Sequence, residues 1–75
     1  MSDLITKQIA RTVCGDFIVS TIWIEETNLY ETMVFTRRNG DLFGDELDSR
    51  RNETLGSALF SHACLLYDYT EGTKK

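Results

Sequence analysis

The chain has 75 residues, of which 41% are hydrophobic and 27% are charged, and its formal net charge is −4. These values predict one small globular domain and exclude an intrinsically disordered chain. The net negative charge argues against a protein that grips nucleic-acid backbones, because phosphate neutralisation needs a surplus of lysine and arginine.

Residues 4–13 are compatible with two structures. Four apolar residues have helical spacing: Leu4, Ile5, Ile9 and Val13. The segment IARTV within this range suits a strand instead. The tripeptide Cys14-Gly15-Asp16 then predicts a turn, because Gly15 can adopt a positive φ and Asp16 can bond nearby amides.

Residues 17–24, FIVSTIWI, predict the central and most buried strand, because both of its alternating faces are largely apolar. After a polar turn, LYETMVFT at residues 29–36 predicts the next strand. Asn39-Gly40 predicts a tight hairpin, since this pair readily adopts a primed turn. The returning residues 41–51 are charged on both faces, and they predict either an edge strand protected by charge or an irregular loop. Gly44 indicates a bulge within them.

A C-terminal helix is predicted from about Thr54 to Tyr69, capped by Asn52 or Thr54 and ended by Gly72. A stripe at steps of three and four predicts the face that packs on the sheet: Leu55, Ala58, Leu59, His62, Ala63, Leu66 and Tyr69. A weaker second stripe indicates another contact surface: Phe60, Cys64 and Tyr67.

The expected fold is therefore an α+β domain, in which the C-terminal helix covers one face of a three- or four-stranded antiparallel sheet. One helix covers only one face, and the central strand is apolar on both. We therefore expect the N-terminal segment or a second chain to cover the other face, and we favour a homodimer.

No residue pattern predicts catalysis or a cofactor. His62 is the only histidine, and we expect it to pack its ring and bond one nitrogen. Cys14 and Cys64 are interpreted as small buried hydrophobes, because the N-terminus lacks a secretory signal and cytosolic thiols stay reduced. His62 and Cys64 are two residues apart on a helix and point in different directions, which argues against a metal site. The longest apolar run, residues 17–24, is too short to cross a membrane.

The candidate partner-binding residues are acidic or aromatic. The acidic candidates form a run of carboxylates: Asp41, Asp45, Glu46 and Asp48. This run could mimic the phosphates of a nucleic acid and so fit a basic groove of a partner. Alternatively, it could be a solvated strand edge that discourages the addition of another strand. We expect the arginine pairs at 37–38 and 50–51 to form ion pairs with Asp45, Glu46 and Asp48. Trp23 and Tyr67 are the aromatic candidates for a binding hot spot.

The order of STIW, YETMVF and GDELDSRR, followed by a threonine-led helix with a mid-helix histidine, resembles small accessory proteins of tailed phages, especially those that infect actinobacteria. That family has no settled activity, so the resemblance implies an origin more than a mechanism. We expect a non-enzymatic protein of the host cytoplasm that binds a host protein or protein–nucleic acid complex, such as a CRISPR effector. The alternative is a self-associating structural or regulatory dimer.

Overall fold

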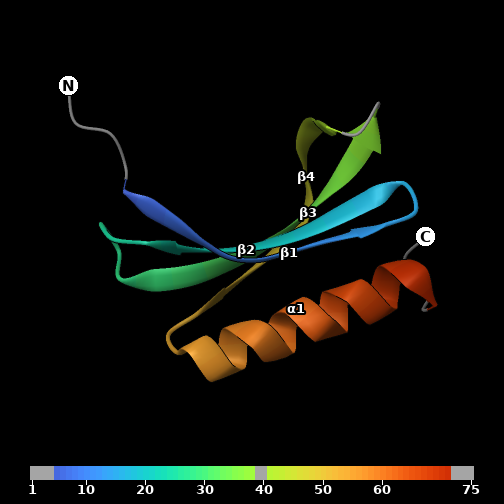
Figure 1. The fold of residues 1–75 in the computed structure, drawn as a ribbon. Coiled ribbons are helices and arrows are strands. Elements are labelled where there is room, and N and C mark those ends of the chain that lie inside the picture. Colours follow the sequence, from blue (N-terminus) through green and yellow to red (C-terminus); the bar gives the residue numbers. More distant parts are fainter. Residues whose placement is uncertain (1–4, 39–40, 72–75) are drawn as a thin grey trace.

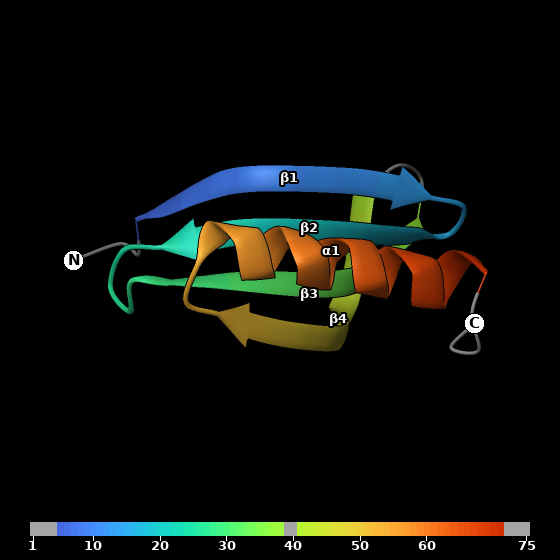
Figure 2. The ribbon, with the colours of Figure 1, turned by 90° about the horizontal axis from the view of Figure 1, so that it is seen from below.

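The fold consists of four strands followed by one helix. The structure is a computed structural model that describes residues 5–38 and 41–71, with only the backbone of 38 and 41–45. Its elements are β1 (Thr6–Cys14), β2 (Phe17–Ile24), β3 (Leu29–Arg38), β4 (Asp41–Asn52) and α1 (Leu55–Thr70). The strands form one antiparallel sheet in the order β1-β2-β3-β4, and α1 lies across one face of it (Figure 1, Figure 2). The predicted α+β class is confirmed.

β2 is an interior strand, as its sequence predicts. Ile18 is fully buried on one face of the sheet, and Val19 and Thr21 are fully buried on the other. β3 pairs with β2 over residues 29–36 and extends two residues beyond the predicted end. The ambiguous N-terminal segment forms β1, because pairing with β2 supplies its backbone with hydrogen bonds that local sequence cannot reveal.

Two tight turns use left-handed backbone. Gly15 has a φ of 58° in the predicted turn between β1 and β2, and Asn28 has a φ of 56° between β2 and β3. Glycine and asparagine are the residues that adopt this conformation most readily. The predicted turn at Asn39-Gly40 lies outside the described residues.

β4 is the second edge strand, and its pairing with β3 is interrupted. Val34 pairs with Asp48 but Thr36 pairs with Phe43, so a two-residue step in β3 matches a five-residue step in β4. We call the intervening residues of β4, 44–47, the arch. They include the glycine at which the sequence predicts a bulge. The β3–β4 hairpin rises here on the side of the sheet away from α1 (Figure 1).

Thr54 is the N-cap of α1, one of the two predicted caps. Its side-chain oxygen accepts a hydrogen bond from the Ser57 backbone N–H at 3.2 Å. The other candidate, Asn52, ends β4 and accepts a hydrogen bond from the Ser61 hydroxyl at 2.8 Å. The helix ends at Thr70, and the prediction that Gly72 ends it lies outside the described residues.

The buried face of α1 differs from the predicted stripe. It consists of Ala58, Ser61, His62, Leu65 and Tyr69. Leu55 and Ala63 are exposed and Leu59 is 42% exposed, so their predicted core positions are wrong. At 100° per residue the observed face is rotated from the predicted one by roughly 70°. The physical reason is that Ser61 and His62 find hydrogen-bond partners in the sheet, which lets polar residues replace leucines in the interface.

The apolar core lies beneath the C-terminal half of α1. Val19 and Val34 from the sheet pack with Leu65 and Tyr69 from the helix. The ring of Tyr69 meets that of Phe17 edge to face, with centroids 5.1 Å apart. This cluster fixes α1 against β2 and β3 and leaves the opposite side of the helix in solvent.

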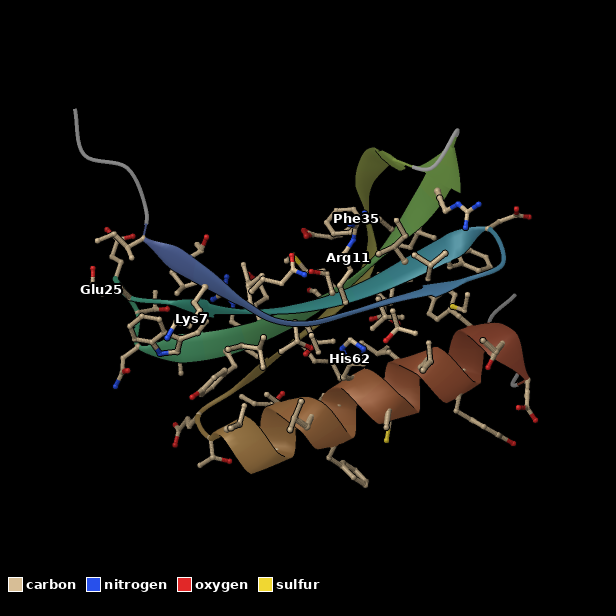
Figure 3. All side chains as sticks on the ribbon, in the orientation of Figure 1. Lys7, Arg11, Glu25, Phe35 and His62 are labelled. Carbon is tan, nitrogen blue, oxygen red and sulfur yellow. The ribbon has the colours of Figure 1, made fainter. Side chains whose placement is uncertain are left out.

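The sheet face away from α1, which we call the open face, is not covered by a helix among the described residues, although Ile18 is fully buried on it. It carries Arg11 and Phe35 (Figure 3). Strand alternation places further apolar side chains beside them: Val13, Ile18, Ile22 and Met33. β1 lies at the sheet edge, so the expectation that the N-terminal segment covers this face is wrong for residues 6–14.

Candidate functional site

His62 lies between α1 and the sheet (Figure 3), and both of its ring nitrogens meet threonine hydroxyls. Nδ1 is 2.8 Å from Thr21 Oγ1, and Nε2 is 3.0 Å from Thr12 Oγ1. Thr21 Oγ1 is also 2.7 Å from Thr32 Oγ1. The four side chains therefore form a polar layer that joins three strands to the helix.

The environment of the His62 imidazole favours its neutral form. His62 is only 7% exposed, and burial lowers its pKa. A neutral ring donates from one nitrogen and accepts at the other, which two hydroxyl partners satisfy in either tautomer. We expected one bonded nitrogen, whereas the structure shows a partner for each. Both nitrogens are thus committed to the core, and the contacts suit a structural role better than proton transfer to a substrate.

The two cysteines are free thiols, and both are half-buried. Burial raises the pKa of the Cys14 thiol, which favours the protonated and unreactive form. A hollow of about 370 Å³ adjoins this thiol at the end of α1, lined by Cys14, Gly15, Asp16, Phe17, Tyr69 and Thr70. Within residues 5–38 and 41–71, no three His, Cys, Asp or Glu side chains gather as metal ligands would.

The predicted acidic cluster is described only in part. The side chains of Asp41 and Asp45 lie outside the described residues, although their backbone belongs to β4. Glu46 is exposed on the arch. Asp48 is half-buried, and its carboxylate accepts a hydrogen bond from the Ser49 backbone N–H at 2.9 Å. Of the acidic candidates, Glu46 is the described one that reaches into solvent.

The second arginine pair binds carboxylates of other elements. Arg50 Nη2 is 4.0 Å from Asp68 Oδ2 on α1, and Arg51 Nε is 3.7 Å from Glu31 Oε2 on β3. Both arginines are substantially exposed, so each pair contributes about 0–1 kcal/mol. These two partners were missed because they are distant in sequence from the acidic run.

The aromatic candidates lie on different parts of the molecule. Trp23 is half-buried, and strand alternation places it on the same side of β2 as Thr21, the side that faces α1. Its Nε1–H donates to Asn28 Oδ1 at 3.3 Å. Tyr67 is 59% exposed near the C-terminal end of α1. Glu46 lies beyond the other side of the sheet, on the arch. The structure therefore separates the predicted contact residues onto three surfaces.

Other exposed apolar side chains define two larger surfaces. On α1, Phe60 is 71% exposed, in agreement with the predicted second stripe. On the other side of the sheet, Leu47 of the arch is 50% exposed and Val13 of β1 is also exposed. Leu47 was not among the predicted contact residues, because it sits within a charged run.

Comparison with known proteins gives no family: no protein-family model, curated protein or solved structure matches the chain. In the part of the chain that the structure describes, no helix has the length and apolar character needed to cross a membrane.

Proposed function

We propose that this protein is a non-enzymatic binding protein that contacts a host macromolecule through the open face of its sheet and the arch. The observation that carries this proposal is a pair of exposed apolar side chains on this side of the molecule, Val13 at 48% and Leu47 at 50%, beside the half-buried Ile22, Met33 and Phe35 of the open face. Contiguous exposed apolar surface on a small protein often marks a contact site.

The shape of this side of the molecule supports a docking role. The sheet curves, and the β3–β4 hairpin rises from one part of it, so the open face is bounded on one side by the arch (Figure 1). Leu47 stands at that boundary with half of its surface exposed, and Glu46 precedes it. An apolar floor beside a charged rim is the usual organisation of a protein–protein interface.

The charge of the molecule favours a basic partner. The chain carries 12 acidic and 8 basic residues, and Glu46 places a carboxylate at the rim of the proposed contact. A protein that binds nucleic acid offers a basic surface of this kind, because it must neutralise phosphates. The partner we propose is a basic groove of a host protein or protein–nucleic acid complex.

The resemblance to phage accessory proteins supports the choice of a host target. A defence nuclease such as a CRISPR effector holds its nucleic acid in a positively charged channel. An acidic protein with an apolar contact face would compete for such a channel in the host cytoplasm. Binding at that place would block the nuclease without any chemical step by the inhibitor.

The test is a binding and inhibition assay with purified CRISPR effector complexes from actinobacteria. We expect the wild-type protein to bind and to reduce cleavage, and Glu46→Lys or Leu47→Lys to weaken binding by about tenfold or more. Glu53→Lys is the matched control, because Glu53 is exposed and its replacement makes the same charge change away from the arch.

The salt dependence of binding separates the contribution of the Glu46 charge from that of the apolar contact at Leu47. A contact led by charge has an association rate that falls as salt rises, so the wild-type rate should fall and that of Glu46→Lys should change less. Equal affinities for Glu46→Lys, Leu47→Lys and the wild type would refute the proposed contact surface. Failure to bind any effector would refute the proposed target.

A further inference from the structure

The side of α1 opposite the core is apolar and faces solvent. Four residues form what we call the outer stripe: Gly56, Phe60, Ala63 and Tyr67. At 100° per residue they lie within about 60° of arc, directly opposite the centre of the buried face. Phe60 and Tyr67 are 71% and 59% exposed. α1 has no Asp, Glu, Lys or Arg before Asp68, and that residue pairs with Arg50.

The order of side-chain sizes along the outer stripe is small, large, small, large. We infer that two copies of this chain pack antiparallel through α1 about a twofold axis, with Phe60 of each copy against Ala63 of the other. The same register brings Gly56 of each copy opposite Tyr67 of the other. Every aromatic ring then meets a residue with little or no side chain, as in knobs-into-holes packing.

The second copy is the occupant that this pattern fits. A twofold interface uses one patch twice, so the patch must complement itself, and the outer stripe does so only when the helices run antiparallel. A parallel pair in register would oppose ring to ring and glycine to glycine. The structure also leaves room at Gly56, where a methyl group added to the Cα would meet nothing within 4 Å.

The charge distribution permits this arrangement despite the net charge of −4. The outer stripe contains no Asp, Glu, Lys, Arg or His, so the pairing brings no like charges together there. The arch with Glu46 lies on the far side of the sheet from α1 (Figure 1), which keeps the acidic rims of the two copies apart. Both open faces then point outward, so the inference is independent of the proposed function.

The size of the interface sets the strength to expect. Two aromatic side chains of about 150–250 Å² each, exposed to 71% and 59%, offer roughly 250 Å² of ring surface per copy. Leu59 adds to this on one flank of the stripe. The apolar area buried per copy stays below the roughly 800 Å² per partner of a standard interface. The dimer should therefore be weak and should form only as the protein concentration rises.

The test is sedimentation equilibrium over a wide concentration range, with four variants. The wild-type mass should rise from 8.6 kDa toward twice that value. Phe60→Ala leaves an unfilled space opposite Ala63 of the other copy, and Ala63→Phe places a second ring against Phe60 of the other copy. Each substitution should therefore weaken association by about tenfold. The double variant Phe60→Ala/Ala63→Phe exchanges large and small across the axis and should restore association. Leu47→Ala, an exposed apolar change off the helix, should leave it unchanged.

Residues 60 and 63 are both exposed, so these variants should fold, and circular dichroism at low concentration checks that they do. A mass that stays at 8.6 kDa at every concentration would overturn the inference. So would an association that Phe60→Ala does not weaken. A double variant as weak as the single variants would overturn the antiparallel register, since complementary exchange is its specific consequence.

Discussion

Leu65→Ala and Leu59→Ala delete the same atoms from one helix in opposite environments. Leu65 is fully buried in the core cluster, so its truncation loses both transfer free energy and packing, about 2–5 kcal/mol. Leu59 is 42% exposed, so little more than half of its surface leaves water on folding. Solvent can fill the space it vacates, and the loss should be about 1 kcal/mol or less.

Urea unfolding followed by circular dichroism measures both losses, at a protein concentration low enough to keep the chain monomeric. A domain of 75 residues is expected to have about 4–11 kcal/mol of stability, so the Leu65 variant should lose a large fraction of it. Equal losses for the two variants would refute the observed rotation of α1. A loss below about 1 kcal/mol for Leu65→Ala would refute the assignment of the core.

Two further predictions concern the polar groups that hold α1. Because burial lowers the pKa of His62 in the folded state, the unfolded state takes up its proton first, and the free energy of unfolding should fall as pH drops below about 6.5. His62→Gln removes this titration, so a slope unchanged by the substitution would contradict the role of His62. Thr54→Ala removes the N-cap and should cost about 1 kcal/mol in urea unfolding, most of which Thr54→Ser should recover. A Thr54→Ser variant as unstable as Thr54→Ala would assign the loss to something other than the hydroxyl.

The strands could be predicted where their own sequence is decisive. Residues 17–24 are largely β-branched or aromatic on both faces, and no other structure suits them as well. Residues 6–14 offer no such preference, because the same apolar residues fit a helix or a strand. Pairing with β2 decides their structure, and that contact is not local.

The rotation of α1 could not be predicted because it depends on residues far away in the chain. Periodicity ranks positions by apolar character, which favours Leu59 over Ser61. In the folded protein Ser61 bonds Asn52, and His62 bonds threonines 41 and 50 positions earlier in the chain. These hydrogen bonds offset the free-energy cost of burying polar atoms, so Ser61 and His62 lie in the interface while Leu55 and Leu59 face solvent.

The contact surfaces were predicted in outline only. The second helical stripe was predicted from Phe60, Cys64 and Tyr67. Phe60 and Tyr67 are exposed, whereas Cys64 is half-buried. Gly44 predicted an irregularity in β4, but not that three extra residues would lift Leu47 above the sheet. The length of a register shift depends on how two strands pair, and the sequence of one strand does not contain that information.

The strand order has a consequence for how the protein folds. Each strand pairs with the one that precedes it in the chain, so the sheet can assemble hairpin by hairpin, with short loops to close at each step. α1 follows all four strands, yet it supplies one wall of the apolar core and the imidazole between the threonines. During ribosomal synthesis, β1 to β4 would emerge with both faces of the sheet wet and Thr21 and Thr32 hydrated. The slowest step of folding should therefore be the docking of α1, which removes water from one face of the sheet in a single step.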